Sequence, residues 1–201
     1  MEYTKGFKFR IYPNAEQQKI INHTLGCARF VHNHFLAVRQ DNWQEKHESV
    51  TYVKSSRLLT ELKCNPDFVW LKSVDSMALQ EALKNLDKAF QNFFKKQSGY
   101  PKFKSKHSHN QSYRTRNQSG GIRIVDGNIK LPRIGIVKTK LSREFEGRIL
   151  NATVSRTASG KYFVSLCVEM DIELLLGRNN GQQIGIDVGI KEFYSNDQGN
   201  T

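Results

Sequence analysis

The chain has 201 residues, and its 31 Lys and Arg against 19 Asp and Glu give a formal net charge of +12 and a pI near 9.7. This length is enough for one large domain or two small ones with a hydrophobic core. The first residues show no apolar segment behind a basic start, and no run approaches the roughly 18 apolar residues of a membrane helix. The charge favours a polyanionic partner, nucleic acid first, over a basic surface without a partner. We therefore expect a cytoplasmic, nucleoid-associated protein.

The first element is a strand over residues 5–12. Its apolar residues fall on one side, at Phe7, Phe9 and Ile11. Lys8 and Arg10 fall on the other side. This alternation predicts a half-buried strand with a basic outer face, and it makes Lys8 and Arg10 candidate nucleic-acid ligands.

A helix follows this strand. Asn14 and Gln17 have the spacing of a capping box, and apolar residues recur at steps of three and four, so we expect a helix over 15–39. Its histidines have no carboxylate at ligand spacing, which favours polar-face or nucleic-acid-facing side chains over metal ligands; they are His23, His32 and His34.

Two more helices complete a predicted bundle over residues 14–97. The second should cover 52–62, and Pro66 should interrupt before a third begins near Val74. The third carries the most regular apolar seam in the chain, which is suited to packing against the other helices.

Residues 118–170 have the pattern of a small antiparallel barrel or sandwich. Asp126 and Gly127 separate two short apolar runs, which is a strong hairpin signal because both positions tolerate positive φ. A central strand over 162–168 is apolar on both faces. The first strand has no partner among the helices and should pair with this sheet, so the helices would be an insertion between its strands.

A basic segment joins the two halves. Residues 95–116 hold five Lys, two Arg and two His and no carboxylate. Cations neutralise phosphates, and aromatic rings stack on unpaired bases. This combination favours nucleic-acid contact over a solvated loop. The candidate residues are Lys95, Lys96, Tyr100, Lys102, Phe103, Lys104, Lys106, Tyr113, Arg114 and Arg116.

Asp187 lies at the centre of an apolar, glycine-flanked strand over 183–194. A carboxylate there needs a partner, and Mg²⁺ is a suitable one because it takes hard oxygen ligands. Backbone donors could satisfy the same carboxylate. Certain ATPases begin with a similar strand, so the motif alone does not decide between these interpretations.

The chain resembles TnpB, the RNA-guided nuclease encoded by bacterial and archaeal insertion sequences. The matching segments occur in family order and span nearly the whole chain: 9–14, 26–36, 78–94, 100–104, 130–132 and 185–191. The resemblance implies an α+β fold, in which a split oligonucleotide-binding wedge barrel holds an inserted helical recognition domain and precedes the first strands of an RNase H-like RuvC domain. The implied parts are wedge strand 1–13, helical domain 14–97, remaining barrel 98–176, linker 177–182 and RuvC start 183–201.

The resemblance also assigns candidate roles. The recognition helices of the family read a short motif beside the target, which points to Tyr52, Ser76 and Gln80. Ser76 and Gln80 lie one helical turn apart, and Gln can bond the N6 and N7 edge of adenine. A purely structural role for Gln80 stays open.

The same resemblance makes Asp187 the first of three RuvC carboxylates that hold a pair of Mg²⁺ ions. The 201 residues include only this one, so we expect that they bind no metal stably and do not cleave DNA by themselves. The expected partners are guide RNA and double-stranded target DNA. The alternative is a nuclease-deficient RNA- or DNA-binding regulator of transposition or transcription.

Overall fold

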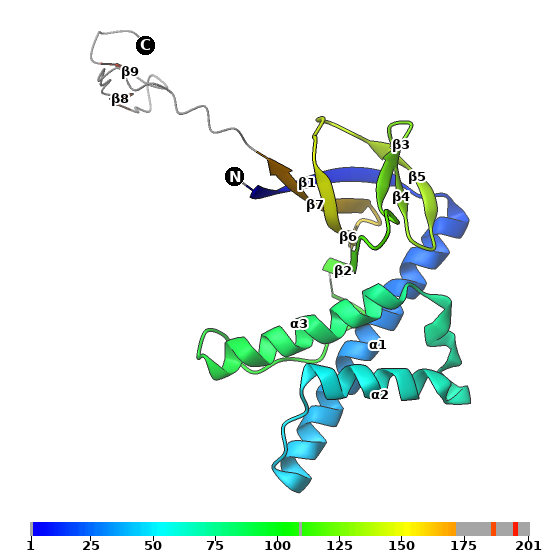
Figure 1. Cartoon of the computed structure of the whole chain (residues 1–201), viewed down its shortest axis with the longest axis vertical. Helices are drawn as coiled ribbons and strands as arrows, with labels where there is room; N and C mark the ends of the chain where they lie inside the picture. The colour runs from blue at the N-terminus through cyan, green and yellow to red at the C-terminus, as the bar shows by residue number, and fades with distance from the viewer. Residues whose placement is uncertain (1, 109, 172–185, 188–194, 197–201) are drawn as a thin grey trace. The chain divides into compact units, whose positions relative to one another are not determined.

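Strand β1 (Glu2–Tyr12) occupies the centre of a seven-stranded antiparallel sheet (Figure 1). The computed structural model describes residues 2–108, 110–171, 186–187 and 195–196. β1 pairs with β7 (Tyr162–Asp171) along most of its length and with β5 (Gly135–Lys140) at its C-terminal end. The prediction that the first strand joins the later sheet, with the helices inserted between, is confirmed.

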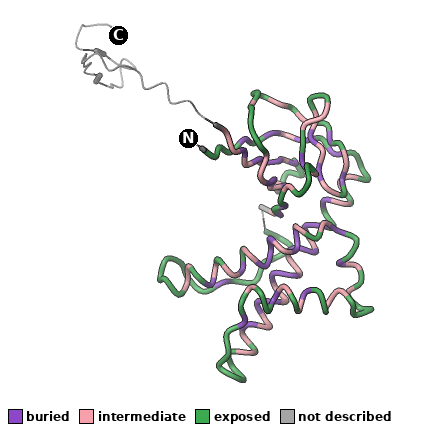
Figure 2. Tube along the Cα trace, viewed as in Figure 1, coloured by how far each residue is buried: buried purple, intermediate pink, exposed green. Residues whose placement is uncertain are grey.

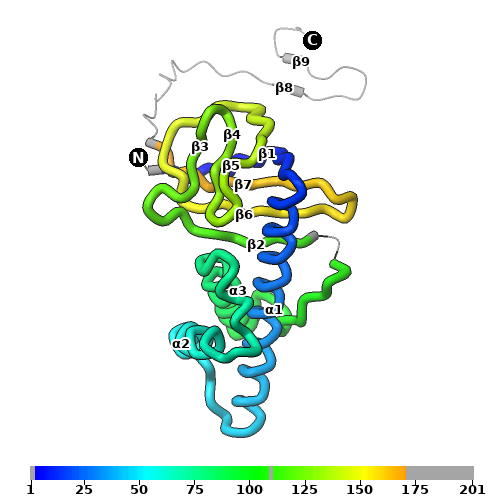
Figure 3. The backbone as a smooth tube through the Cα atoms, turned by 90° about the vertical axis from the view of Figure 1, so that its right-hand side faces the viewer, coloured from blue at the N-terminus to red at the C-terminus, as the bar shows by residue number. Residues whose placement is uncertain are grey.

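The sheet has the strand order β2-β6-β7-β1-β5-β4-β3 and curls into a half-barrel (Figure 3). Its other strands are β2 (Asn110–Arg116), β3 (Arg123–Val125), β4 (Asn128–Leu131) and β6 (Arg148–Thr157). The β3–β4 turn has positive φ at Asp126 (48°) and Gly127 (71°), as a type I′ hairpin requires. The predicted hairpin and the central position of β7 are therefore confirmed. After the helices the sheet resumes with β2 at Asn110, before the strand pattern predicted over residues 118–170.

The helices are α1 (Ala15–Lys46), α2 (Tyr52–Cys64), the 3₁₀ helix η1 (Pro66–Ser73) and α3 (Ser76–Phe94). The capping box of Asn14 and Gln17 is present. α1 runs past the predicted residue 39, because the following residues include no Gly or Pro, and it ends at His47 in a left-handed conformation. No described helix is long and apolar enough to cross a membrane.

The predicted interruption at Pro66 is confirmed, since α2 ends at Cys64 and α3 begins at Ser76, and the residues between them form η1 rather than an irregular loop. The first residue of a helix needs no N–H donor, so proline fits there. The side chain of Asn65 accepts a hydrogen bond from the backbone N–H of Asp67 at 3.0 Å and caps this end. The chain therefore turns between α2 and α3 through an ordered helical connection.

The core runs without a break from the inner face of the sheet into the helices (Figure 2). On the sheet side, the Phe145 ring lies 4.8 Å from that of Phe7 and 6.1 Å from that of Phe9 between centroids. On the helical side, Leu79 and Leu83 of the α3 seam are fully buried. Each such side chain contributes about 1.5–3 kcal/mol on burial, so sheet and helices stabilise each other.

Strands β8 (Ile186–Asp187) and β9 (Ser195–Asn196) pair antiparallel, with Asp187 opposite Ser195. The side chain of Asp187, the predicted linker 177–182 and most of the predicted RuvC start 183–201 lie outside the described residues.

Two glycines of the fold should respond oppositely to alanine. At Gly147, φ is +131° and an added Cβ would lie 2.2 Å from the carbonyl oxygen of Glu169, whereas Gly26 lies within α1 with nothing within 4 Å of its added Cβ. We expect Gly147→Ala to lower the free energy of unfolding by about 2–4 kcal/mol. Gly26→Ala should raise it by about 0.5–1 kcal/mol. Urea denaturation measures both, and a stable Gly147→Ala variant would contradict the β6–β7 geometry.

Candidate nucleic-acid interface

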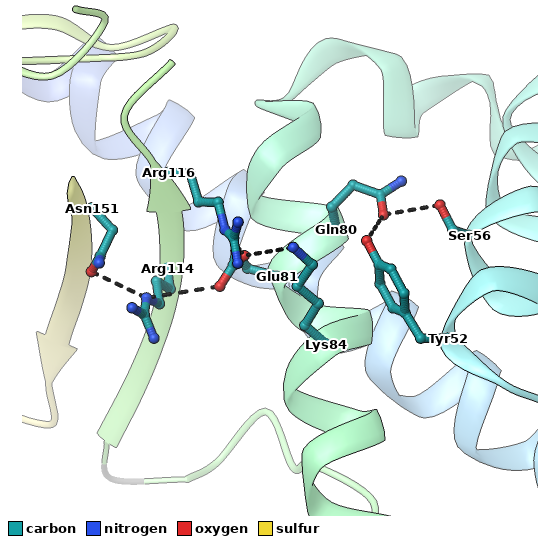
Figure 4. Close-up of polar contacts among 8 residues, drawn as sticks. All are labelled: Tyr52, Ser56, Gln80, Glu81, Lys84, Arg114, Arg116 and Asn151. Atoms are coloured by element: carbon teal, nitrogen blue, oxygen red, sulfur yellow. Dashed lines mark hydrogen bonds and ion pairs between the residues drawn. The ribbon is translucent and has the colours of Figure 1, made fainter.

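Gln80 of α3 is held by two hydroxyl groups of α2 (Figure 4). Its side-chain oxygen accepts a hydrogen bond from the Tyr52 hydroxyl at 3.0 Å and another from the Ser56 hydroxyl at 3.1 Å. The amide nitrogen of Gln80 has no partner among the described residues. Both lone pairs of the oxygen are therefore used, and the two N–H donors stay available for a further partner.

Lys84 extends this polar surface along α3. Its Nζ lies 5.5 Å from the centroid of the Tyr52 ring, in a cation–π arrangement, and 3.8 Å from Oε1 of Glu81. Ser76, one turn before Gln80, is exposed. The structure thus brings the predicted Tyr52, Ser76 and Gln80 to neighbouring positions on α2 and α3.

Glu81, the residue after Gln80, forms ion pairs with two arginines of β2 and accepts a hydrogen bond from one of them. Its side chain is only 5% exposed, while those of Arg114 and Arg116 are 44% and 54% exposed. Nε of Arg116 donates to Oε1 of Glu81 at 2.6 Å, and Nε of Arg114 lies 3.8 Å from Oε2. Arg114 also donates to Oδ1 of Asn151 on β6 at 3.1 Å.

These contacts form a polar line that crosses from β6 through β2 and α3 to α2 (Figure 4). One buried carboxylate faces three cations along it, so the cluster keeps a net positive charge. Because the arginines are half exposed and fixed in direction, they are suited to binding phosphate oxygens as well as Glu81. Sequence reasoning found the arginines but missed Ser56, Glu81 and Lys84. The i, i+4 spacings of Ser56 after Tyr52 and of Lys84 after Gln80 were the available signal.

The outer face of the sheet continues this surface. Strand register places Lys8 beside Ser165, Thr153 and Arg114 in one row across β1, β7, β6 and β2. Lys8 Nζ lies 4.9 Å over the Phe163 ring.

Arg10 lies on the same face as Lys8. Its guanidinium lies 5.2 Å from the Tyr12 ring centroid and 5.5 Å from that of Phe163. Nε of Arg10 is buried and has no hydrogen-bond partner among the described residues. The face therefore offers cations beside aromatic rings, as the alternating sequence suggested.

The basic segment does not form a single surface. Lys95 and Lys96 are exposed where α3 ends, and Tyr100 packs edge-on against Phe90 and Phe93. A loop that runs beside α1, away from the Glu81 cluster of β2 and α3, carries the remaining candidates Lys102, Phe103, Lys104 and Lys106.

Tyr113 does not have the nucleic-acid-binding role predicted from the sequence. Its side chain is 6% exposed in the core, so it has no free ring face for a base. Burial and the nearby Asp75 carboxylate both raise the pKa of its hydroxyl. In β2 it alternates with the outward Arg114 and Arg116, and this period of two places it on the inner face.

The histidines of α1 do not all lie on a polar face as predicted, since His32 is buried and His34 is only partly exposed. His32 is buried, and burial, with a further contribution from the charge of Lys104, lowers its pKa to about 4. The His34 ring packs on Phe30 and Phe35 at centroid distances of 5.6 and 5.1 Å. Both are structural residues, while His23 stays exposed and contacts the Ser73 hydroxyl at 2.9 Å.

The side chains that commonly bind metal ions do not gather into a cluster in the part of the chain that the structure describes. The described residues contain no group of three His, Cys, Asp or Glu placed to hold an ion. Of the two-stranded β8–β9 pair, Asp187 is the one carboxylate among described positions. A pair of Mg²⁺ ions needs several shared carboxylates, which a single aspartate does not supply.

Replacement of Glu81 should reveal how much the ion cluster stabilises the fold. Glu81→Gln keeps the shape but removes the charge that faces Arg114, Arg116 and Lys84, so we expect a loss of about 1–3 kcal/mol in free energy of unfolding. Glu16→Gln is the matched control, because its pair with Lys19 is about three-quarters exposed on both sides and should change stability by less than ~0.5 kcal/mol. Equal effects of the two substitutions in denaturant titrations would contradict a stabilising role for the Glu81 ion cluster.

Comparison with known proteins places this geometry in a family. A helix-turn-helix domain model, HTH_OrfB_IS605, matches residues 1–48, which span β1 and α1. "Putative RNA-guided DNA endonuclease InsQ" of Escherichia coli (strain K12) is 30% identical over 96% of this chain and 47% of its own length. "Putative RNA-guided DNA endonuclease" of Streptomyces pristinaespiralis is 35% identical over 95% of this chain and 47% of its own length.

A shorter relative covers part of the chain. "Virulence protein VsdF" of Salmonella dublin is 36% identical over 48% of this chain and 88% of its own length. By contrast, the chain spans about half the length of the two endonuclease-named relatives. The curled sheet with inserted helices, the matched helix-turn-helix model and these similarities agree: the chain belongs to the TnpB family.

Proposed function

We propose that this chain is the nucleic-acid-binding N-terminal portion of a transposon-encoded, RNA-guided DNA endonuclease of the TnpB type. The net charge of +12 and the names of the two relatives that match most of the chain support a nucleic-acid partner. In this proposal residues 2–171 bind guide RNA and double-stranded target DNA. Cleavage belongs to a RuvC domain of which residues 183–201 are the first strands.

The observation that carries the proposal is the fixed amide of Gln80. Its oxygen is held by Tyr52 and Ser56, so its N–H donors are left without a partner among the described residues (Figure 4). Acceptors in the major groove, such as purine N7, guanine O6 and thymine O4, distinguish base pairs from one another. The α2–α3 surface therefore reads a base edge of the duplex, with Ser76 one turn away.

This arrangement refines the expected adenine contact. A bidentate pair with adenine needs the Gln oxygen to accept from N6. In the structure both lone pairs of that oxygen are taken, so adenine recognition would require release of either the Tyr52 or the Ser56 hydroxyl. The side chain as held serves as a donor, and it favours a base edge that presents acceptors.

The remaining surface serves the phosphate backbone. Arg114, Arg116 and Lys84 flank Gln80 and bind phosphates beside the base that it reads. The curled sheet acts as an oligonucleotide-binding wedge barrel, and its outer row from Lys8 to Arg114 offers guide RNA cations and aromatic rings. Such a division assigns sequence reading to the helices and backbone binding to the sheet.

Substitution of Gln80 tests the base-reading role. In a selection of randomised duplexes with the purified chain, Gln80→Ala should relax preference at one base pair by roughly 5- to 100-fold and leave overall affinity nearly unchanged. Gln91→Ala removes the same side chain from an exposed position of the same helix, where it bonds Asp87, and is the matched control. Unchanged base preference in Gln80→Ala would refute the assignment.

A cleavage assay tests the division of labour. We expect the 201-residue chain with RNA, Mg²⁺ and duplex DNA to bind but not cut, because Asp187 is the one RuvC carboxylate that the resemblance assigns within it. Gel analysis of labelled DNA measures this. Cutting that disappears in Asp187→Ala would show that these residues form a complete nuclease and would overturn this part of the proposal.

A further inference from the structure

A groove beside α1 is independent of the surface described above. Two adjoining hollows of about 480 and 300 Å³ share Arg29 and Gln111 in their linings. The larger one lies between Leu25 and Ala28 of α1 and the loop over residues 102–105. The smaller one reaches Arg156 at the β6–β7 turn. Volumes of this order are typical of sites for small ligands or for parts of larger ones.

The charge of this groove is unbalanced. Its lining contains five cations and no carboxylate; the cations are Arg29, Lys102, Lys104, Lys106 and Arg156. Among the described residues Arg29 has neither an ion pair nor a hydrogen bond. By contrast, Arg114 and Arg116 share the carboxylate of Glu81. Like charges placed together repel unless a counter-ion intervenes, so the groove is complementary to an anion with several charges.

The groove is held in place by specific contacts. The Asn33 side-chain amide donates to the carbonyl of Lys104 at 3.0 Å and accepts from its backbone N–H at 2.8 Å, as a neighbouring strand would. His32 Nε2 lies 3.3 Å from the carbonyl of Lys102, and partial burial lowers the pKa of Lys104. A loop that only carried solvated charge would not need these hydrogen bonds from Asn33 and His32.

The opposite wall is also fixed. Asn22 Oδ1 accepts from Arg156 at 3.2 Å and from the Tyr162 hydroxyl at 3.3 Å. The Arg156 guanidinium lies 6.0 Å from the Tyr162 ring centroid. The Arg156 guanidinium is therefore held in direction by one wall, and the backbone of the loop on the other wall is held by Asn33, which reduces the ordering cost of binding.

The chemistry of the lining indicates the ligand. Phe103 is 56% exposed and lines the larger hollow together with Leu25 and Ala28, so its ring is open to a base. Cations that follow a backbone, combined with an aromatic ring that stacks a base, are typical of single-strand binding. We propose that this groove binds single-stranded nucleic acid, with phosphates at Arg29, Lys104 and Arg156 and one unpaired base at Phe103. The proposal depends on the proposed function only for the class of ligand.

Fluorescence anisotropy with the full chain tests this groove. The probes are oligouridylate and oligothymidylate of about ten nucleotides, and comparison of their affinities shows whether the groove prefers RNA or DNA. Arg29→Gln and Phe103→Ala should each weaken single-strand affinity about tenfold, and Arg29→Gln should lower the salt slope by about 0.7. Arg123→Gln removes an equal charge at an exposed position of β3 outside both hollows and should have little effect. Circular dichroism verifies that each variant is folded.

The outcomes separate the groove from the α2–α3 surface. Equal weakening by Arg29→Gln and Arg123→Gln, or no effect of Phe103→Ala, would overturn the groove assignment even if duplex reading by Gln80 holds. If Gln80→Ala leaves duplex preference intact while Arg29→Gln abolishes single-strand binding, the groove stands and the reading surface fails. Absence of binding to either single-stranded probe by the unsubstituted chain would defeat the groove proposal alone, whereas absence of duplex binding would defeat the reading surface.

Discussion

The ion cluster around Glu81 is the contact that sets the relation of sheet to helices. It joins Arg114 and Arg116 of β2 to Lys84 of α3 at the edge where the sheet meets the bundle. A buried carboxylate is costly unless it is paired and hydrogen-bonded, so α3 is held in the one position that brings Glu81 to both arginines. A second polar contact, between the Asp75 carboxylate and the Thr115 hydroxyl, fixes the start of α3 against the same strand. The apolar core stabilises the two halves, and these polar contacts determine their orientation.

The described residues include two kinds of cation, those beside the Glu81 carboxylate and those of the groove around Arg29. Those around Glu81 are partly neutralised and held in direction, which suits the placing of a backbone beside a base-reading side chain. Those around Arg29 have no carboxylate in their groove and gain most from a polyanion. Gln80, bonded to α2 through its oxygen, lies directly next to Glu81 in sequence. Neighbouring positions on α3 therefore serve two purposes: Glu81 orients the helix against the sheet, and Gln80 is the proposed base-reading side chain.

Local patterns in the sequence predicted most elements, because they depend on near neighbours. The alternation around Phe7 and Lys8, the capping box at Asn14 and the turn at Gly127 each act over a few residues, and each was confirmed. The Glu81 cluster was not predicted, since its partners lie more than 30 residues later and only tertiary packing brings them together. Tyr113 was misassigned because its aromatic ring was weighed by composition, although its alternation with Arg114 places it inward. Arg29 was overlooked since a lone arginine on a helix gives no signal until the loop over residues 102–105 is seen beside it.

The central claim is that this fold presents fixed cations to a nucleic-acid backbone. The salt dependence of duplex DNA affinity tests it most directly, because each neutralised phosphate releases counter-ions. For the purified chain between 50 and 200 mM salt, the account predicts a linear fall of log affinity against log salt, with a slope for B-DNA that corresponds to roughly three or more phosphates. An affinity that does not change with salt, or the absence of duplex binding at low salt, would contradict it.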